Sequence, residues 1–110
     1  MKTKQQRNNL SRDLFKWATK QHASNMSVNG FYIDTCNRSG SIWFQRDSDD
    51  ACVYLNYNWD DAGDVLNGHI GSECWDDNGM IADIDCSNIS TLDDLVALYI
   101  ASVKSITEAL

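Results

Sequence analysis

The sequence FYIDTCNRSGSIWFQR, residues 31–46, contains two short β-rich runs separated by a turn. Aromatic and β-branched side chains dominate both runs, and Asn-Arg-Ser-Gly at 37–40 has the composition of a tight turn. In the second run Ile42 and Phe44 fall on one face of a strand, whereas Trp43 and Gln45 fall on the other. The stretch predicts two antiparallel strands that bury one face.

Similar strands are expected further along the chain. In residues 51–57, Val53 and Leu55 alternate with Cys52 and Tyr54 after an acidic turn at 47–50. Residues 66–75 and 80–86 are two more expected strands. Asp-Asp-Asn-Gly at 76–79 is expected to join them, because Asn-Gly is typical of a two-residue hairpin turn. Residues 59–64 are expected to form a loop or a helical turn, and residues 25–30 a polar connection.

A helix is expected over residues 4–22. Leu10, Leu14 and Trp17 recur at the spacing of one apolar helix face. The opposite face is basic and carries Arg12, Lys16 and Lys20. That basic face is interpreted as a solvated surface, with contact to acidic partners, or weakly to nucleic acid, as the alternative.

A second helix is expected at the end of the chain. Ser90 or Thr91 is placed to cap it, with Asp93 or Asp94 completing a capping box. Its apolar stripe consists of Leu92, Val96, Tyr99, Val103, Ile106 and Leu110. Part of this helix is also a candidate dimer contact. The predicted fold is therefore one α+β domain, residues 1–110, with an N-terminal helix, an antiparallel sheet of four to five strands and a C-terminal amphipathic helix packed on the sheet.

Composition narrows the class of protein. The chain has 110 residues, 43% of them hydrophobic, and no proline. It lacks an apolar run long enough for a secretory signal or a membrane span, so a cytoplasmic protein without membrane contact is expected. Cys36, Cys52, Cys74 and Cys86 contain no close pair. Buried thiols are therefore favoured over disulfides or a metal site.

The charges are unevenly distributed. Residues 1–22 carry six Lys or Arg and one Asp, whereas residues 23–110 carry three Lys or Arg and fifteen Asp or Glu. Between Asp47 and Asp94 there are thirteen acidic residues and no Lys or Arg. This stretch serves solubility alone, or it complements a basic partner, as a nucleic-acid mimic does. Direct nucleic-acid binding through it is disfavoured because phosphates repel carboxylates.

No catalytic, metal-binding or cofactor motif stands out. The glycines near the acidic loops do not fit the calcium-binding EF-hand pattern. His22 and His69 are the only histidines, and neither is spaced for pairing with a cysteine nucleophile. The chain is therefore expected to be no enzyme and to need no metal or cofactor.

These features favour a non-enzymatic binding protein. We expect it to inhibit or neutralise a basic, possibly nucleic-acid-handling partner by covering its groove, as a phage-encoded inhibitor of a bacterial defence complex (anti-CRISPR-like) or a toxin-immunity protein does. Its two Trp-Asp-Asp strings suggest aromatic anchors ringed by carboxylates. The expected partner-binding residues are Asp47, Asp49, Asp50, Trp59, Asp60, Asp61, Asp64, Trp75, Asp76 and Asp77. The alternative is a small acidic dimeric chaperone or adaptor that holds a client segment. The expected oligomeric state of the protein is a monomer or a homodimer.

Overall fold

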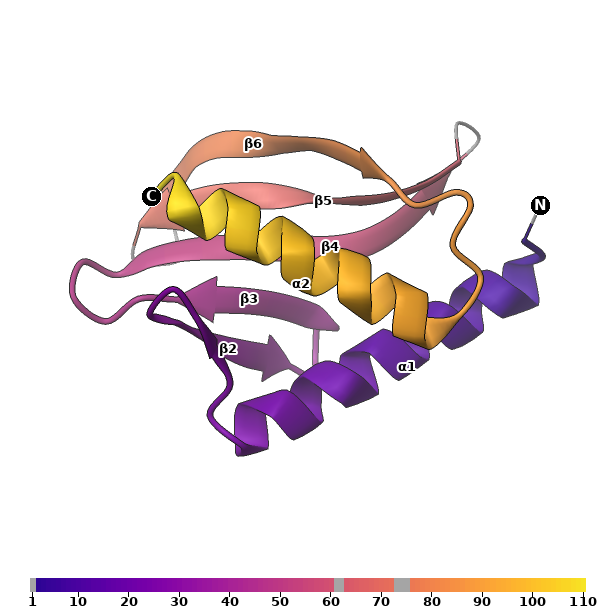
Figure 1. The fold of residues 1–110 in the computed structure, drawn as a ribbon, viewed down its shortest axis with the longest axis horizontal. Coiled ribbons are helices and arrows are strands. Elements are labelled where there is room, and N and C mark those ends of the chain that lie inside the picture. The colour runs from indigo at the N-terminus through magenta and orange to yellow at the C-terminus, as the bar shows by residue number, and fades with distance from the viewer. Residues whose placement is uncertain (1, 61–62, 73–75) are drawn as a thin grey trace.

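The computed structural model describes residues 2–60, 63–72 and 76–110, without the side chains of residues 76–78. Within those residues a helix precedes six strands and a second helix follows them (Figure 1). The elements are α1 (Lys4–Ala23), β1 (Ser27–Val28), β2 (Phe31–Cys36), β3 (Ser41–Gln45), β4 (Ala51–Asp60), β5 (Gly63–Ser72), β6 (Asp76–Asp85) and α2 (Leu92–Glu108).

The strands form one antiparallel meander in the order β1-β2-β3-β4-β5-β6. The α+β prediction is therefore confirmed, but the predicted count of four to five strands is wrong. The additional strand is β1, two residues that pair with the start of β2 in the expected polar connection. Two residues are too few to show an alternating pattern, so composition alone could not reveal this strand.

Two predicted turns also lie elsewhere. Trp59 and Asp60 continue β4, and Gly63 and Asp64 begin β5, so the expected loop at 59–64 is wrong for these four residues. Asn78-Gly79 lies inside β6, where Asp77 pairs with Gly71 and Gly79 with Ile70. The register shift at this point accommodates one extra residue, as a β-bulge does. Strand pairing with β5 therefore overrides the local turn preference of Asn-Gly.

Both helices pack on the same face of the sheet. α1 begins with a capping box between Thr3 and Gln6, and α2 begins at the Thr91 N-cap. In α2 the buried Tyr99 donates a hydrogen bond of 2.7 Å to the carbonyl of Leu55 in β4. Trp17 of α1 packs edge-on against the same ring at 5.9 Å between centroids. Tyr99 therefore joins both helices to the sheet, as the apolar stripes predict.

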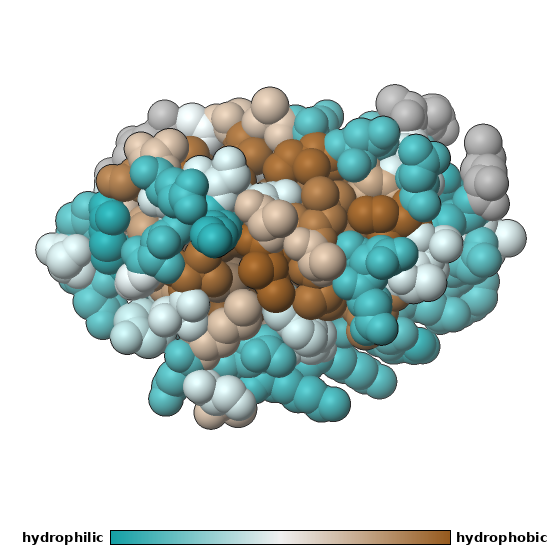
Figure 2. All heavy atoms as spheres, in the orientation of Figure 1, coloured by the Kyte–Doolittle hydropathy of each residue, from teal (hydrophilic) through white to brown (hydrophobic). Residues whose placement is uncertain are grey.

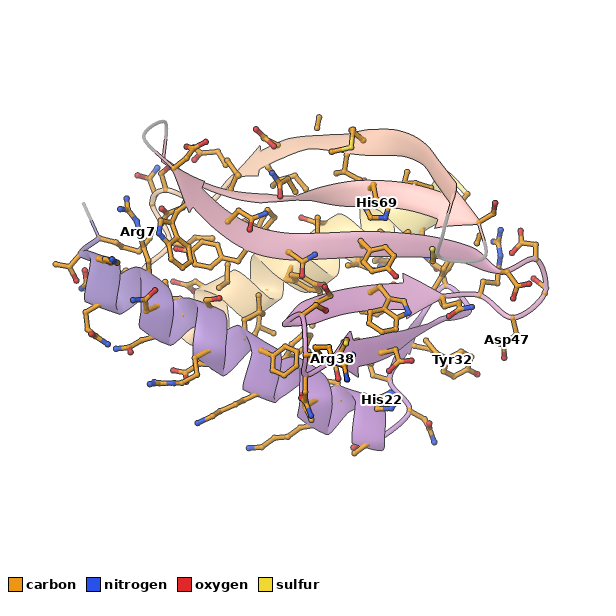
Figure 3. The ribbon with its side chains drawn as sticks, turned by 180° about the vertical axis from the view of Figure 1, so that it is seen from behind. Arg7, His22, Tyr32, Arg38, Asp47 and His69 are labelled. Atoms are coloured by element: carbon orange, nitrogen blue, oxygen red, sulfur yellow. The ribbon has the colours of Figure 1, made fainter. Side chains whose placement is uncertain are left out.

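The hydrophobic core lies between the sheet and the helices. Its buried sheet residues include Ile42, Phe44, Val53 and Leu55, the faces that the alternation predicts. Figure 2, seen from the α2 side, shows hydrophobic residues gathered in the middle of the view and hydrophilic residues around them. No helix in the described part of the chain has the length and apolar character needed to span a membrane. Within the described residues, no helix lies on the opposite face of the sheet (Figure 3).

Candidate interaction surface on the open face of the sheet

Five side chains lie in a row across the open face, one from each of five strands. Strand pairing sets Asp34 opposite Trp43, Trp43 opposite Tyr54, Tyr54 opposite His69, and His69 opposite Met80. Side chains of directly opposed residues are neighbours on one face of an antiparallel sheet. We call these five residues the open-face row. It crosses the sheet from β2 to β6, and Met80 at its end is 72% exposed.

Aromatic stacking holds the middle of the open-face row. The rings of Trp43 and Tyr54 stack with centroids 5.5 Å apart and an interplanar angle of 27°. Tyr54 and His69 stack at 4.5 Å and 23°. The indole N–H of Trp43 is buried and has no hydrogen-bond acceptor among the described residues. The middle of the row is therefore a ridge of stacked rings with restricted side chains, and binding to it loses little conformational entropy.

Close packing of the backbone supports this ridge. Gly68 lies in β5 beside His69, opposite Leu55, and a Cβ at this position would be 1.9 Å from the carbonyl oxygen of Tyr54. Only glycine allows β4 and β5 to approach this closely. The contact brings the backbone of Tyr54 and the strand bearing His69 together.

The predicted binding residues at the β3–β4 turn are exposed. Asp47, Asp49 and Asp50 all have exposed side chains. Arg46 pairs with Asp49 at 2.7 Å, and this hydrogen bond lowers the pKa of Asp49 to about 2. Asp50 has a φ of 56°, which an aspartate tolerates better than most residues do. Asp47 has no hydrogen bond or ion pair within the described residues.

Trp59 and Asp60 occupy the far end of β4. Trp59 is half-buried on the helix-covered side, packed against the core, with its ring centroid 5.5 Å from that of Tyr57. It is therefore not an exposed anchor on the open face. Asp60 is exposed at the end of the strand.

Asp64, which was predicted to bind the partner, does not belong to the exposed acidic surface. Its side chain is 1% exposed and accepts a hydrogen bond of 2.7 Å from the hydroxyl of Tyr57. Lys2 Nζ lies 2.8 Å from Oδ2, and Arg7 Nε lies 2.7 Å from Oδ1. Burial opposes ionisation of Asp64, but Lys2, Tyr57 and Arg7 outweigh it, so its pKa lies below the usual value. A single carboxylate with two cationic partners can be buried in this way.

The described parts of the two Trp-Asp-Asp strings lie at opposite ends of β5. Asp60 pairs with Gly63 at one end of β5, whereas Asp76 pairs with Ser72 at the other. β5 has ten residues, so its ends lie roughly 30 Å apart at about 3.4 Å per residue. Asp61 and Trp75 lie outside the described residues, and the side chains of Asp76 and Asp77 are not described.

Chemically reactive groups are sparse in the described part of the chain. It holds no group of three or more His, Cys, Asp or Glu placed to bind a metal ion. Cys52 and Cys86 are buried thiols, as expected, and burial raises the pKa of Cys86 to about 11. Cys36 is partly exposed, and hydrogen bonds from Ser39 lower the pKa of its thiol. Cys74 lies outside the described residues.

Sequence reasoning missed the open-face row, although part of its signal is in the sequence. Trp43 and Tyr54 were expected on the face opposite the core, but the stacking partner of each depends on strand register. The four-residue turn after Cys36 sets the pairing of β2 with β3. The pairing of His69 with Tyr54 depends on the long β4–β5 hairpin, which was expected to be interrupted by a loop.

No protein-family model, no curated protein and no solved structure matches the chain. The surface features that bear on function are the row of stacked rings and the exposed carboxylates around it.

Proposed function

We propose that this protein is a non-enzymatic binding protein that covers a basic surface of a partner protein with the open face of its sheet. The observation that carries the proposal is the open-face row, in which Trp43, Tyr54 and His69 stack on a surface without a covering helix. Rigid aromatic groups at the centre of a surface are typical anchors of protein interfaces, because little side-chain entropy is lost when they bind.

The charges around the row favour a basic partner. β4, β5 and β6 contain no Lys or Arg. Exposed carboxylates surround the face from the β3–β4 turn to the far ends of β4 and β6: Asp47, Asp50, Asp60, Asp83 and Asp85. A field of one sign accelerates association with a surface of the opposite sign and makes it sensitive to salt. The same field disfavours single-stranded nucleic acid, which otherwise stacks on aromatic platforms.

Occlusion of a basic groove would inhibit the partner protein. A protein of this size that covers a basic groove in the cytoplasm inhibits a nucleic-acid-binding partner by occlusion. A bacterial defence complex blocked by a phage protein and a basic toxin neutralised by its immunity protein are two such settings. Mimicry of a nucleic-acid backbone requires only carboxylates held on a rigid surface, and Asp47, Asp60 and Asp85 lie on or beside strands.

Binding should be tested with a double substitution that shortens the open-face row. His69→Ala/Met80→Ala removes one stacked ring and the most exposed member of the row. The matched control is Lys104→Ala/Glu108→Ala, two exposed residues of α2 on the other side of the molecule. Immobilised wild-type protein should capture a basic protein from host lysate at low salt and release it at high salt.

Affinity for the captured protein, once purified, should fall at least about tenfold in the row variant, because interface anchors typically contribute more than 1 kcal/mol each. The α2 variant should bind like the wild type. Unchanged affinity in the row variant, or a captured partner without a basic surface, would overturn the proposal.

A dimeric chaperone or adaptor is the second candidate, because several apolar residues of α2 are only half-buried: Leu92, Val96, Leu98 and Ile106. They belong to the helix-covered side where Figure 2 shows hydrophobic residues gathered. The buried part of that helix, Leu95, Tyr99 and Val103, already packs within the protein's own core. Sedimentation at micromolar concentration separates the two candidates: a monomer contradicts the dimeric chaperone.

A further inference from the structure

A hollow of about 320 Å³ lies at one corner of the open face. It is formed by the end of α1, the start of β2 and the end of β3 with the turn that follows. The residues that line it include His22, Asn25, Tyr32, Asp34, Gln45 and Asp47. Figure 3 shows Tyr32 between His22 and Asp47 at this corner. We call this hollow the corner pocket.

Strand geometry explains why these groups converge. Tyr32 and Asp34 are two residues apart in β2, so both point to the open face. Tyr32 pairs with Gln45 across the strands, and Asp47 follows two residues later in the chain. Asp34 also begins the open-face row, opposite Trp43. The corner pocket is therefore continuous with the surface proposed to bind the partner.

The corner pocket is electrostatically negative. Asp34 and Asp47 contribute carboxylates, and α1 ends beside them with the negative end of its dipole. Arg46, which lies between Gln45 and Asp47 in the chain, is directed elsewhere: it pairs with Asp49, and its guanidinium lies 4.6 Å from the centroid of the Phe31 ring. His22 Nδ1 lies 3.0 Å from the carbonyl oxygen of Ile33 and 3.6 Å from Asp34 Oδ1.

Several groups in the corner pocket have unused binding capacity. Within the described residues the side chains of Tyr32, Gln45 and Asp47 make no hydrogen bond or ion pair. Asp34 uses Oδ1 to accept from the backbone N–H of Thr35 at 2.7 Å. Its second oxygen has no hydrogen bond within the described residues. The Tyr32 side chain is half-exposed, so one face of its ring is accessible.

We propose that the corner pocket binds one arginine side chain of the basic partner. This inference rests on the proposed function and adds the group that is recognised. A guanidinium is planar, so it can stack on the ring of Tyr32 while its N–H groups donate to Asp34 and Asp47. The amide oxygen of Gln45 accepts a further N–H. Lysine offers a single point charge and satisfies fewer of these groups at once.

The test uses a peptide, so it does not depend on finding the partner. The probe is acetyl-Gly-Gly-Arg-Gly-Gly-amide, titrated into isotopically labelled protein and followed by NMR. The neutral probe replaces arginine with citrulline, which has nearly the same shape, and a third probe carries lysine. We expect saturable shifts of the backbone signals of Tyr32, Gln45 and Asp47 with the arginine peptide, weaker binding of the lysine peptide and none of the citrulline peptide.

Substitutions locate the binding. Asp47→Asn and Tyr32→Leu should each weaken arginine-peptide binding at least about fivefold, the effect of losing one charge pair or one cation–π contact. Asp93→Asn, an exposed aspartate in the first turn of α2, is the matched control and should bind like the wild type. Equal binding of the citrulline and arginine peptides, or unchanged binding by Asp47→Asn, would overturn the assignment. Equal binding of the lysine peptide would overturn the preference for arginine.

The two proposals fail separately. The His69→Ala/Met80→Ala variant lacks part of the open-face row but keeps every residue of the corner pocket, so it should bind the arginine peptide normally. If the arginine peptide binds but no basic partner is captured, only the proposed function is therefore contradicted. If the partner is captured through the open-face row but the arginine peptide does not bind, only the proposal for the corner pocket is contradicted.

Discussion

Lys2 and Asp64 form a buried ion pair, with Lys2 Nζ 2.8 Å from Asp64 Oδ2 and side chains that are 5% and 1% exposed. The same ammonium group donates to the backbone carbonyls of Cys86 at 3.2 Å and Ser87 at 2.8 Å, and also to that of Ile89. Cys86 N–H in turn donates to the carbonyl of Asp64 at 3.1 Å. The pair therefore joins the segment before α1 to the start of β5 and to the connection between β6 and α2.

Replacing Lys2 should destabilise the fold. Lys2→Met removes the ammonium group and leaves Asp64 with Arg7 as its only cationic partner among the described residues. Breaking a buried ion pair by removing one partner costs about 3–5 kcal/mol, and the remaining Arg7 places the expected loss near the lower value. Urea unfolding, monitored by circular dichroism, measures this loss of unfolding free energy. Lys4→Met, an exposed lysine two positions along, should change the unfolding free energy by less than about 0.5 kcal/mol. Similar losses in the two variants would contradict the structural role of the pair.

Acid should weaken the protein through Asp64. The pKa of Asp64 is lowered in the folded state, because Lys2, Tyr57 and Arg7 stabilise the carboxylate against the effect of burial. A carboxyl group of this kind contributes stability above its unfolded pKa of about 3.9, and this contribution is lost as the pH falls through the folded pKa. The difference in unfolding free energy between wild type and Asp64→Asn should stay constant above about pH 5 and shrink below about pH 4. A difference that stays constant down to pH 2 would show that Asp64 is not the responsible group.

Local patterns predicted the elements whose signal lies within a few residues. The spacing of Leu10 and Leu14 gave α1, and the alternation around Ile42 and Phe44 gave the buried face of β3. Such patterns arise because each element buries one side, and the period of the sequence records which side it is. The alternation in residues 51–57 predicted the two faces of β4 in the same way.

Contacts between distant residues could not be predicted in this way. Nothing near Asp64 in the sequence distinguishes it from its acidic neighbours, because its cationic partners Lys2 and Arg7 lie near the N-terminus. Asn78-Gly79 failed as a turn for a related reason: its place in β6 depends on the register with β5. The open-face row depends on four successive registers, each of which follows from turn lengths and bulges rather than from any single strand.

Gly68 should tolerate no side chain. The Cβ of Gly68→Ala would lie 1.9 Å from the carbonyl oxygen and 2.6 Å from the carbonyl carbon of Tyr54, so β4 and β5 must separate. Forced expansion of a packed region costs about 1–3 kcal/mol, and a clash with backbone atoms of β4, which cannot rotate away as a side chain can, places this variant at the upper end. Thermal or urea unfolding measures the loss.

Gly79→Ala has open space around its Cβ and should stay within about 1 kcal/mol of the wild type. The separation should also weaken the stacking of Tyr54 on His69, which near-ultraviolet circular dichroism reports. A Gly68→Ala protein as stable as Gly79→Ala would refute the close approach.

Cys36 should react with iodoacetamide faster than the buried thiols. Hydrogen bonds from Ser39 lower the pKa of Cys36, whereas burial raises the pKa of Cys86 to about 11. Alkylation requires the thiolate, so near neutral pH the rate follows both the thiolate fraction and access. In a Cys74→Ser background, peptide mapping by mass spectrometry should find Cys36 labelled first, with Cys52 and Cys86 labelled only after unfolding. Ser39→Ala should slow the labelling of Cys36, because it removes the hydroxyl that stabilises the thiolate. Equal labelling of Cys36 and Cys86 in the folded protein would contradict this environment.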